Sequence, residues 1–244
     1  MKIEKIIINE EKNATLTAYN PDISDEMPNM KVRPAMLVIP GGGYHMCSDR
    51  EAEPVAVEYL SQGFNAFVLR YSVGKDCRFE DPLGDAKRAL EIIREKSGEW
   101  HTDPERIAVC GFSAGGHLAA IVSNEASVRP SACILLYPCI SKKAEDVLVF
   151  PIPPADKAVS EDTPPTFICA AADDSIVPIS NSLGYASALA QNGVDFELHI
   201  FSRGGHGFSL GNEIVFESRD MVEACAPLTG WAKRSAEWFR KIIL

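Results

Sequence analysis

Short strand-like runs alternate with helix-like runs along most of this chain. The runs rich in β-branched and aromatic residues predict strands, and apolar residues at helical spacing predict helices. The expected strands cover residues 3–9, 14–19, 35–40, 64–71, 106–112, 131–138, 166–171 and 195–201. The expected helices cover residues 53–63, 81–98, 114–126, 180–192 and 228–243. This order predicts an α/β fold with a mostly parallel sheet covered on both faces, preceded by an antiparallel hairpin.

The length of the chain, 244 residues, suits one α/β domain, and we expect a single domain over residues 1–244. One segment, 141–165, is rich in proline and charged residues and has no clear period. A mobile linker is one reading of it. Because the segment lies inside the alternating pattern, a lid or cap loop over a site is the favoured prediction.

The charge balance restricts the partners. The formal net charge is −10, and an acidic surface of this kind repels phosphate backbones and anionic lipid, so we expect no nucleic acid and no membrane partner. No window approaches the roughly 18 apolar residues of a membrane span. The amino-terminal run Ile6–Ile8 is too short for a signal-peptide core and is followed by Glu10 and Glu11, so we expect a cytoplasmic protein.

The seven cysteines include no C-x-x-C pair, and several lie inside apolar runs. This pattern predicts reduced, buried thiols in core strands. The spacing of a zinc site is absent from the sequence, so no metal is expected.

The sequence Gly111-Phe112-Ser113-Ala114-Gly115 lies between an expected strand and an expected helix. A G-x-S-x-G motif on such a turn exposes the serine hydroxyl at the carboxyl end of the sheet, beside the amino-terminus of the helix. Ser113 is therefore the predicted nucleophile. The alternative is a turn of small residues that lets the helix pack closely on the strand.

A serine hydroxyl needs a base to remove its proton. His206 lies in the glycine-rich run 203–208 directly after the last expected strand, where a loop can hold an imidazole over the sheet edge. A loop histidine in solvent is the alternative reading. We expect His117, four residues after Ser113, and His199 to be structural.

A third group must orient the base, and Asp173 and Asp174 follow the strand 166–171. Spacing alone does not choose between them, and both are also typical of a solvated turn. The order serine, aspartate, histidine along the chain is that of the α/β-hydrolases.

Negative charge develops on a carbonyl oxygen in the transition state, so hydrogen-bond donors are needed. The run Pro40-Gly41-Gly42-Gly43-Tyr44 follows an early strand. We expect one donor N–H from Gly42 or Gly43 and one from Ala114, with Gly41, Tyr44 and His45 binding substrate. A phosphate-binding loop is disfavoured because no Lys-Ser/Thr pair follows the glycines.

Together these residues resemble the α/β-hydrolase superfamily, and more narrowly its acetyl-esterase and lipase-like branch with a glycine-rich oxyanion loop. Further matching segments are SDREAEPVA (48–56), DPLGDAKRALEIIRE (81–95), DPERIAVCGFSAGGHLAA (103–120), TPPTFICAAADDSIVP (163–178) and GGHGF (204–208). The resemblance covers nearly the whole chain from residue 35 onward.

The resemblance implies a three-layer α/β-hydrolase fold and favours Asp174, since the family's aspartate usually precedes Val-Pro by three residues. The chain departs from the family at Pro40, where histidine is common. Members act on small acyl esters, including acetylated sugars. The expected protein is therefore a serine esterase for short acyl groups that needs no cofactor and forms a homodimer. A peptidase, thioesterase or arylformamidase with the same triad, or a non-catalytic binding protein, are the alternatives.

Overall fold

A central sheet organises the described residues, which are 1–125, 127, 129–141 and 147–242 of this computed structural model. Within them the sheet has eight strands in the spatial order β1-β2-β4-β3-β5-β6-β7-β8. The strands are β1 (Lys2–Asn9), β2 (Ala14–Asn20), β3 (Arg33–Ile39), β4 (Asn65–Arg70), β5 (Thr102–Phe112), β6 (Ala132–Leu136), β7 (Thr166–Ala171) and β8 (Phe196–Phe201).

The two strands at one edge run against the rest. β1 pairs with β2 and β2 with β4 in antiparallel register, whereas every pair from β4 to β8 is parallel. The predicted hairpin and the predicted mostly parallel sheet are both confirmed.

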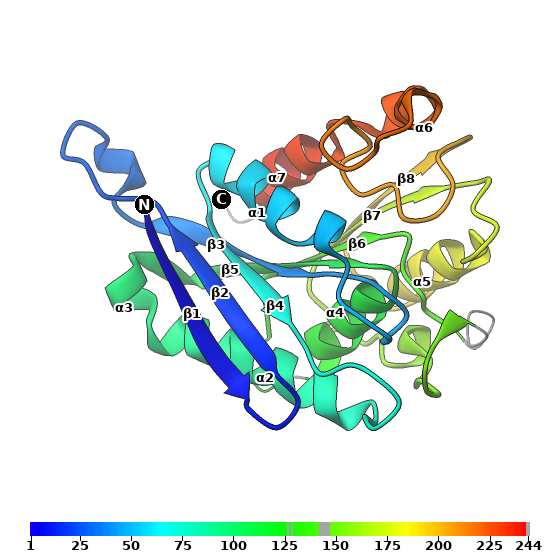
Figure 1. Cartoon of the computed structure of the whole chain (residues 1–244), viewed down its shortest axis with the longest axis horizontal. Coiled ribbons are helices and arrows are strands. Elements are labelled where there is room, and N and C mark those ends of the chain that lie inside the picture. The colour runs from blue at the N-terminus through cyan, green and yellow to red at the C-terminus, as the bar shows by residue number, and fades with distance from the viewer. Residues whose placement is uncertain (126, 128, 142–146, 243–244) are drawn as a thin grey trace.

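Helices cover both faces of the sheet, so the molecule has three layers (Figure 1). α1 and α7 lie on one face, and α2, α4 and α5 lie on the other. The helices are α1 (Glu53–Ser61), α2 (Glu80–Glu95), α3 (Ser97–Trp100), α4 (Ser113–Glu125), α5 (Ser180–Gln191), α6 (Arg219–Cys225) and α7 (Trp231–Ile242).

The central strands are apolar on both faces because each face has its own core. On β3, Leu37 packs with the cluster under α2 and α4, while Val38 packs with the cluster under α1 and α7. On β5, Val109 packs with the first of these clusters and Cys110 with the second. Alternate side chains of a strand point to opposite faces, and burial of both explains the continuous apolar runs.

The cysteines follow the same pattern. All seven are free thiols, and all except Cys47, which is half-buried, are buried. The predicted place in core strands is confirmed for Cys110, Cys133 and Cys169 and is wrong for the other four, because Cys225 lies in α6 and the remaining three lie in loops.

Most ends of helices and strands differ by a few residues from the sequence prediction, and some differences are larger. Residues 102–105, which precede the expected strand 106–112, belong to β5, because Thr102 pairs with Arg33 and its hydroxyl accepts a hydrogen bond of 2.7 Å from Asn65 Nδ2. The helix expected over 81–98 divides into α2 and the single turn α3, which ends at His101 with a φ of +52°. α6 has no counterpart in the prediction, and residues 126 and 243 of two expected helices lie outside the described residues.

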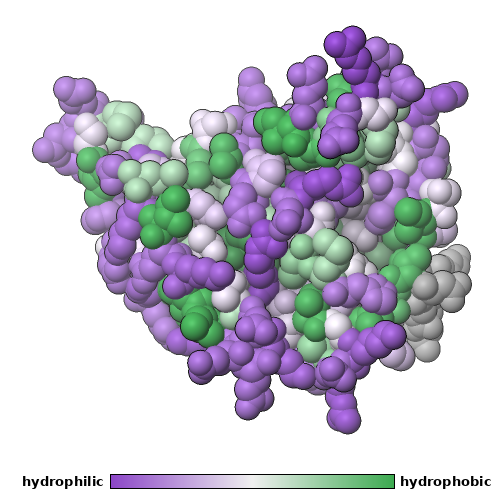
Figure 2. Space-filling view, viewed as in Figure 1, coloured by the Kyte–Doolittle hydropathy of each residue, from purple (hydrophilic) through white to green (hydrophobic). Residues whose placement is uncertain are grey.

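On the face seen in Figure 2, hydrophilic side chains separate small hydrophobic areas, in keeping with the net charge of −10. No helix among the described residues is long and apolar enough to cross a membrane.

Candidate active site

Ser113 stands on a sharp turn between β5 and α4 with a φ of +51°, a strained conformation for a residue with a side chain. The flanking glycines make the turn possible. A Cβ atom on Gly111 would lie 2.3 Å from the Gly115 carbonyl oxygen, and one on Gly115 would lie 2.2 Å from the Ile39 carbonyl oxygen. The close packing of the helix on the strands thus requires the two glycines of the G-x-S-x-G motif.

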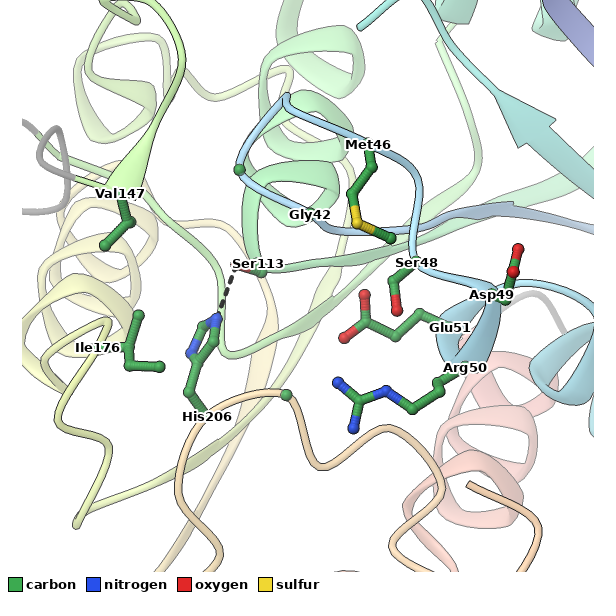
Figure 3. Close-up of a pocket in the computed structure, with 12 residues that line it drawn as sticks. Gly42, Met46, Ser48, Asp49, Arg50, Glu51, Ser113, Val147, Ile176 and His206 are labelled. Atoms are coloured by element: carbon green, nitrogen blue, oxygen red, sulfur yellow. Dashed lines mark hydrogen bonds between the residues drawn. The ribbon is translucent and has the colours of Figure 1, made fainter. Parts of the chain in front are cut away.

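A continuous line of hydrogen bonds joins Ser113, His206 and Asp174. Ser113 Oγ lies 2.8 Å from His206 Nε2, and His206 Nδ1 lies 2.7 Å from Asp174 Oδ2 (Figure 3 shows the first contact). Since a carboxylate only accepts, the imidazole donates from Nδ1 and its Nε2 is free to accept the serine proton. Both Ser113 and Asp174 are buried.

The two neighbouring aspartates have different partners. Asp174 Oδ1 accepts the N–H groups of Ile176 and Val177 at 2.9 and 2.8 Å, which fixes the carboxylate facing His206. Asp173 Oδ1 accepts the N–H of Gly205 at 2.9 Å and so holds the loop that carries the histidine. Asp174 is therefore the aspartate that contacts the imidazole.

The glycine loop after β3 presents unpaired donors. Gly42 and Gly43 have φ values of +126° and +63°, and among the described residues neither N–H has an acceptor. Ala114 is the second residue of α4, where first-turn N–H groups have no partner within the helix. Gly42, Gly43 and Ser113, the residue before Ala114, border the same cavity.

Gly41, Tyr44 and His45, expected to bind substrate, do not line that cavity. The Gly41 N–H donates to Glu51 Oε2 at 2.8 Å, and the His45 side chain is exposed to solvent. Tyr44 is fully buried among Tyr71, Phe79, His117 and Phe150, so the expectation that it binds substrate is wrong.

His117 is structural, as expected. Its Nδ1 contacts the Tyr44 hydroxyl at 2.8 Å, and its Nε2 contacts the Pro153 carbonyl oxygen at 2.7 Å. Burial lowers the pKa of His117 to about 4, so the imidazole is neutral near pH 7.

Glu51 is a site residue that the sequence analysis missed. Its buried carboxyl accepts Gly41 N–H through Oε2 and the Tyr137 hydroxyl through Oε1, the latter at 2.7 Å. Burial raises the pKa of this carboxyl above its usual range. In the sequence, the only indication of a role for Glu51 was its position in SDREAEPVA (48–56), one of the segments that resemble the family.

The cavity at the site has a volume of about 470 Å³. Figure 3 shows Val147 and Ile176 on one side of Ser113 and His206. The other side is formed by residues of one segment, which are Met46, Ser48, Asp49, Arg50 and Glu51.

The segment 141–165 lies partly outside the described residues, which omit 142–146. Its described part packs on the glycine loop. Val149 N–H donates to the Gly43 carbonyl oxygen at 3.0 Å, and Val147 lines the cavity. Its role as a lid or cap remains a prediction.

Comparisons with known proteins agree with this architecture. A BD-FAE family model matches residues 22–133, and a prolyl oligopeptidase family model matches residues 141–236. An α/β hydrolase enzyme from a Medee basin deep-sea metagenome library is 44% identical, with a TM-score of 0.92 over 99% of this chain and 98% of that one. An acetyl ester-xyloside bifunctional hydrolase from Caldicellulosiruptor lactoaceticus is 34% identical, with a TM-score of 0.83 over 98% of this chain and 96% of that one.

The curated relatives are longer proteins. An acetylxylan esterase of Xylanibacter ruminicola is 32% identical over 82% of this chain and 45% of its own length. Endo-1,4-beta-xylanase B of Butyrivibrio fibrisolvens is 34% identical over 75% of this chain and 34% of its own length. The chain thus spans less than half of these relatives. With the solved structures, they show that it belongs to the α/β-hydrolase family, in the group related to acetylxylan esterases.

Proposed function

We propose that this chain is a serine esterase that hydrolyses small carboxylic esters, chiefly acetic esters of sugars or similar alcohols, through an acyl-enzyme on Ser113. The observation that carries the proposal is the line of hydrogen bonds from Ser113 through His206 to Asp174 at the edge of a cavity. The relatives named as acetylxylan esterase and acetyl ester-xyloside hydrolase support the ester class.

The first half-reaction forms the acyl-enzyme. His206 Nε2 takes the Ser113 proton while Oγ bonds to the carbonyl carbon, and the bond from that carbon to the alcohol oxygen then breaks. The leaving alcohol takes the proton from His206. The N–H groups of Gly42, Gly43 and Ala114 stabilise the negative oxygen, and Asp174 stabilises the imidazolium.

The second half-reaction restores the serine. Water gives a proton to His206 and bonds to the acyl carbon, and the bond to Ser113 Oγ breaks as Oγ takes the proton back. The free acid leaves.

The size of the cavity supports a short acyl group. Val147 and Ile176 limit its apolar side, and the whole cavity of about 470 Å³ must also hold part of the alcohol. We expect turnover to fall from acetyl to butyryl to octanoyl esters. A preference for octanoyl esters would contradict this part of the proposal.

The test is replacement of the nucleophile. Ser113→Ala should lower kcat/KM for 4-nitrophenyl acetate roughly ten-thousandfold or more, with an unchanged melting temperature. Ser187→Ala, at an exposed serine of α5, is the matched control and should behave as the unsubstituted protein.

A fluorophosphonate probe gives a second readout, since it should label the unsubstituted protein and not Ser113→Ala. Undiminished turnover in Ser113→Ala would end the proposal. Faster cleavage of 4-nitroacetanilide or a thioester than of the matched ester would replace the esterase assignment with an amidase or thioesterase.

A further inference from the structure

One cation that lines the active-site cavity contacts an aromatic ring but forms no ion pair among the described residues. It is the guanidinium of Arg50, which Figure 3 shows directed into the space beside Glu51 and the loop after His206. No hydrogen bond or ion pair of this side chain occurs in the described part of the chain. An unpaired guanidinium at a cavity wall is a ready site for an anion.

One aromatic contact orients the Arg50 side chain, which is otherwise exposed to solvent. The guanidinium lies over the ring of Phe216, 5.5 Å from the ring centroid. The backbone is fixed as well, because the Arg50 carbonyl oxygen accepts the Ser209 hydroxyl at 2.5 Å. The cation is therefore positioned before a substrate arrives, which lowers the entropic cost of using it.

The neighbouring carboxylates already have other partners. Asp49 pairs with Arg70 at 2.8 Å, and Arg70 also pairs with Glu53. Both oxygens of Glu51 accept hydrogen bonds, from Gly41 and Tyr137. Among the described residues, the Arg50 guanidinium is thus left at the cavity wall without a carboxylate at ion-pair distance, although it acts on the nearby Glu51 through its charge.

The position of Arg50 indicates which part of the ester it meets. His206 must give its proton to the leaving alcohol oxygen, so the alcohol lies on the His206 side of the cavity. Arg50 lies on that side: a Cβ atom built on Gly207, the residue after His206, would be 3.6 Å from Arg50 Nη2. The apolar side chains of Val147 and Ile176 instead suit a short acyl group.

We propose that Arg50 binds a carboxylate on the alcohol part of the substrate, so that the preferred substrates are acetic esters of acidic alcohols such as uronic acids. This inference rests on the proposed function of Ser113. The planar guanidinium can form two parallel N–H···O bonds with the carboxylate, and Ser48 on the same wall can bind a hydroxyl of the same alcohol.

The test compares two acetic esters of the same shape, 4-acetoxybenzoate, which is anionic, and 4-acetoxybenzamide, which is neutral. The measured quantity is the ratio of their kcat/KM values. Because the chemical reactivity of each ester is the same for every variant, a change in this ratio reports recognition. Arg50→Gln should lower the ratio roughly ten- to a hundredfold, the range expected for hydrogen bonds to charged groups.

Two further variants complete the design. Arg50→Lys keeps the charge but loses the planar pair of donors, so its ratio should lie between those of the unsubstituted protein and Arg50→Gln. Arg234→Gln removes an exposed cation that also lies over an aromatic ring, Phe201, but on α7 outside the cavity, and should leave the ratio unchanged. Melting temperatures verify that each variant is folded.

The possible results distinguish a wrong assignment of Arg50 from a wrong assignment of the esterase function. If the neutral ester is hydrolysed in a Ser113-dependent way but Arg50→Gln leaves the ratio unchanged, the inference is wrong and the esterase stands. If Arg50→Gln instead impairs 4-nitrophenyl hydrogen succinate, whose carboxylate is on the acyl part, the assignment to the alcohol is wrong. Absence of Ser113-dependent hydrolysis of the neutral ester would overturn the proposed function itself.

Discussion

The Glu51 carboxyl and the Tyr137 hydroxyl lie 2.7 Å apart in the buried wall of the site. Tyr137 also accepts the Ser209 N–H at 3.0 Å, and Glu51 also accepts the Gly41 N–H. Three segments far apart in the chain are thereby joined: the glycine loop, the residue after β6, and the loop that carries His206. The pair therefore links the loop of the proposed oxyanion donors to the loop of the proposed base.

Removal of the Glu51 carboxyl should therefore impair turnover. Glu51→Ala leaves Gly41 N–H and the Tyr137 hydroxyl without acceptors, and we expect kcat for 4-nitrophenyl acetate to fall roughly ten- to a hundredfold. Glu51→Gln keeps one acceptor oxygen and should recover part of that loss. Glu95→Ala, at an exposed glutamate of α2 that pairs with Arg88, is the control. Equal activity of Glu51→Ala and the control would show that the contact positions nothing.

The adjacent aspartates provide a second comparison. Asp174→Asn replaces the acceptor of His206 Nδ1–H with an amide and should lower kcat roughly a thousandfold or more, because the imidazole loses its orientation and the stabilisation of its charged form. Asp173→Asn keeps an oxygen that accepts from Gly205 and should cost at most about tenfold. Steady-state kinetics of both variants measure the difference. The reverse order of the two effects would assign the catalytic role to Asp173.

Two glycine-to-alanine changes should have opposite effects on stability. Gly115→Ala places a methyl group 2.2 Å from the carbonyl oxygens of Ile39 and Pro40, and we expect the free energy of unfolding to fall by about 3 kcal/mol or more. Gly184→Ala, inside α5 with no atom within 4 Å of the added Cβ, should raise it by about 0.5–1 kcal/mol. Urea denaturation measures both values. A Gly115→Ala variant as stable as the unsubstituted protein would show that the helix can move away from the strands.

The lowered pKa of His117 should make the folded protein less stable in acid. Its pKa is about 4 in the folded chain against 6.5 for the unperturbed group, so below about pH 6.5 the unfolded chain binds a proton that the folded chain does not. The contribution of this group to stability is complete above that pH and falls as the pH decreases toward 4. Between pH 7 and pH 5 the loss is about 2 kcal/mol.

His117→Gln supplies the comparison, because glutamine can accept from Tyr44 and donate to Pro153 without titrating. From pH 7 to pH 5, the unfolding free energy of the unsubstituted protein should fall by about 2 kcal/mol more than that of His117→Gln. The same pH dependence in both proteins would exclude His117 as its source.

Much of the site was predictable because parallel strands end at one edge of the sheet. Ser113, Asp174 and His206 each follow an expected strand, so strand order alone predicted that their side chains would meet. The choice between Asp173 and Asp174 needed the structure or the family resemblance, since both follow β7 and only the turn at Ile176 and Val177 directs one carboxylate to the imidazole.

The lining of the cavity was not predictable in the same way. Tyr44 adjoins the glycines in sequence, yet it has a φ of +61° and its ring is buried against α2 and α4. Glu51 and Arg50 lie in a single turn of 3-10 helix with no period to mark them. Their roles depend on partners 86 and 166 positions away, Tyr137 and Phe216, and such contacts leave no local pattern.

The hydrogen bond from Val149 to Gly43 has a consequence for how an ester is selected. Val147 lines the cavity, and its carbonyl oxygen would lie only 2.5 Å from a Cβ atom on Gly43, so the two segments are in close backbone contact. A bulky acyl group that pushes Val147 outward must also displace Gly43, one of the proposed oxyanion donors. For esters with oversized acyl groups, the rate at which Ser113 Oγ bonds to the carbonyl carbon should therefore fall more than the affinity of the initial complex.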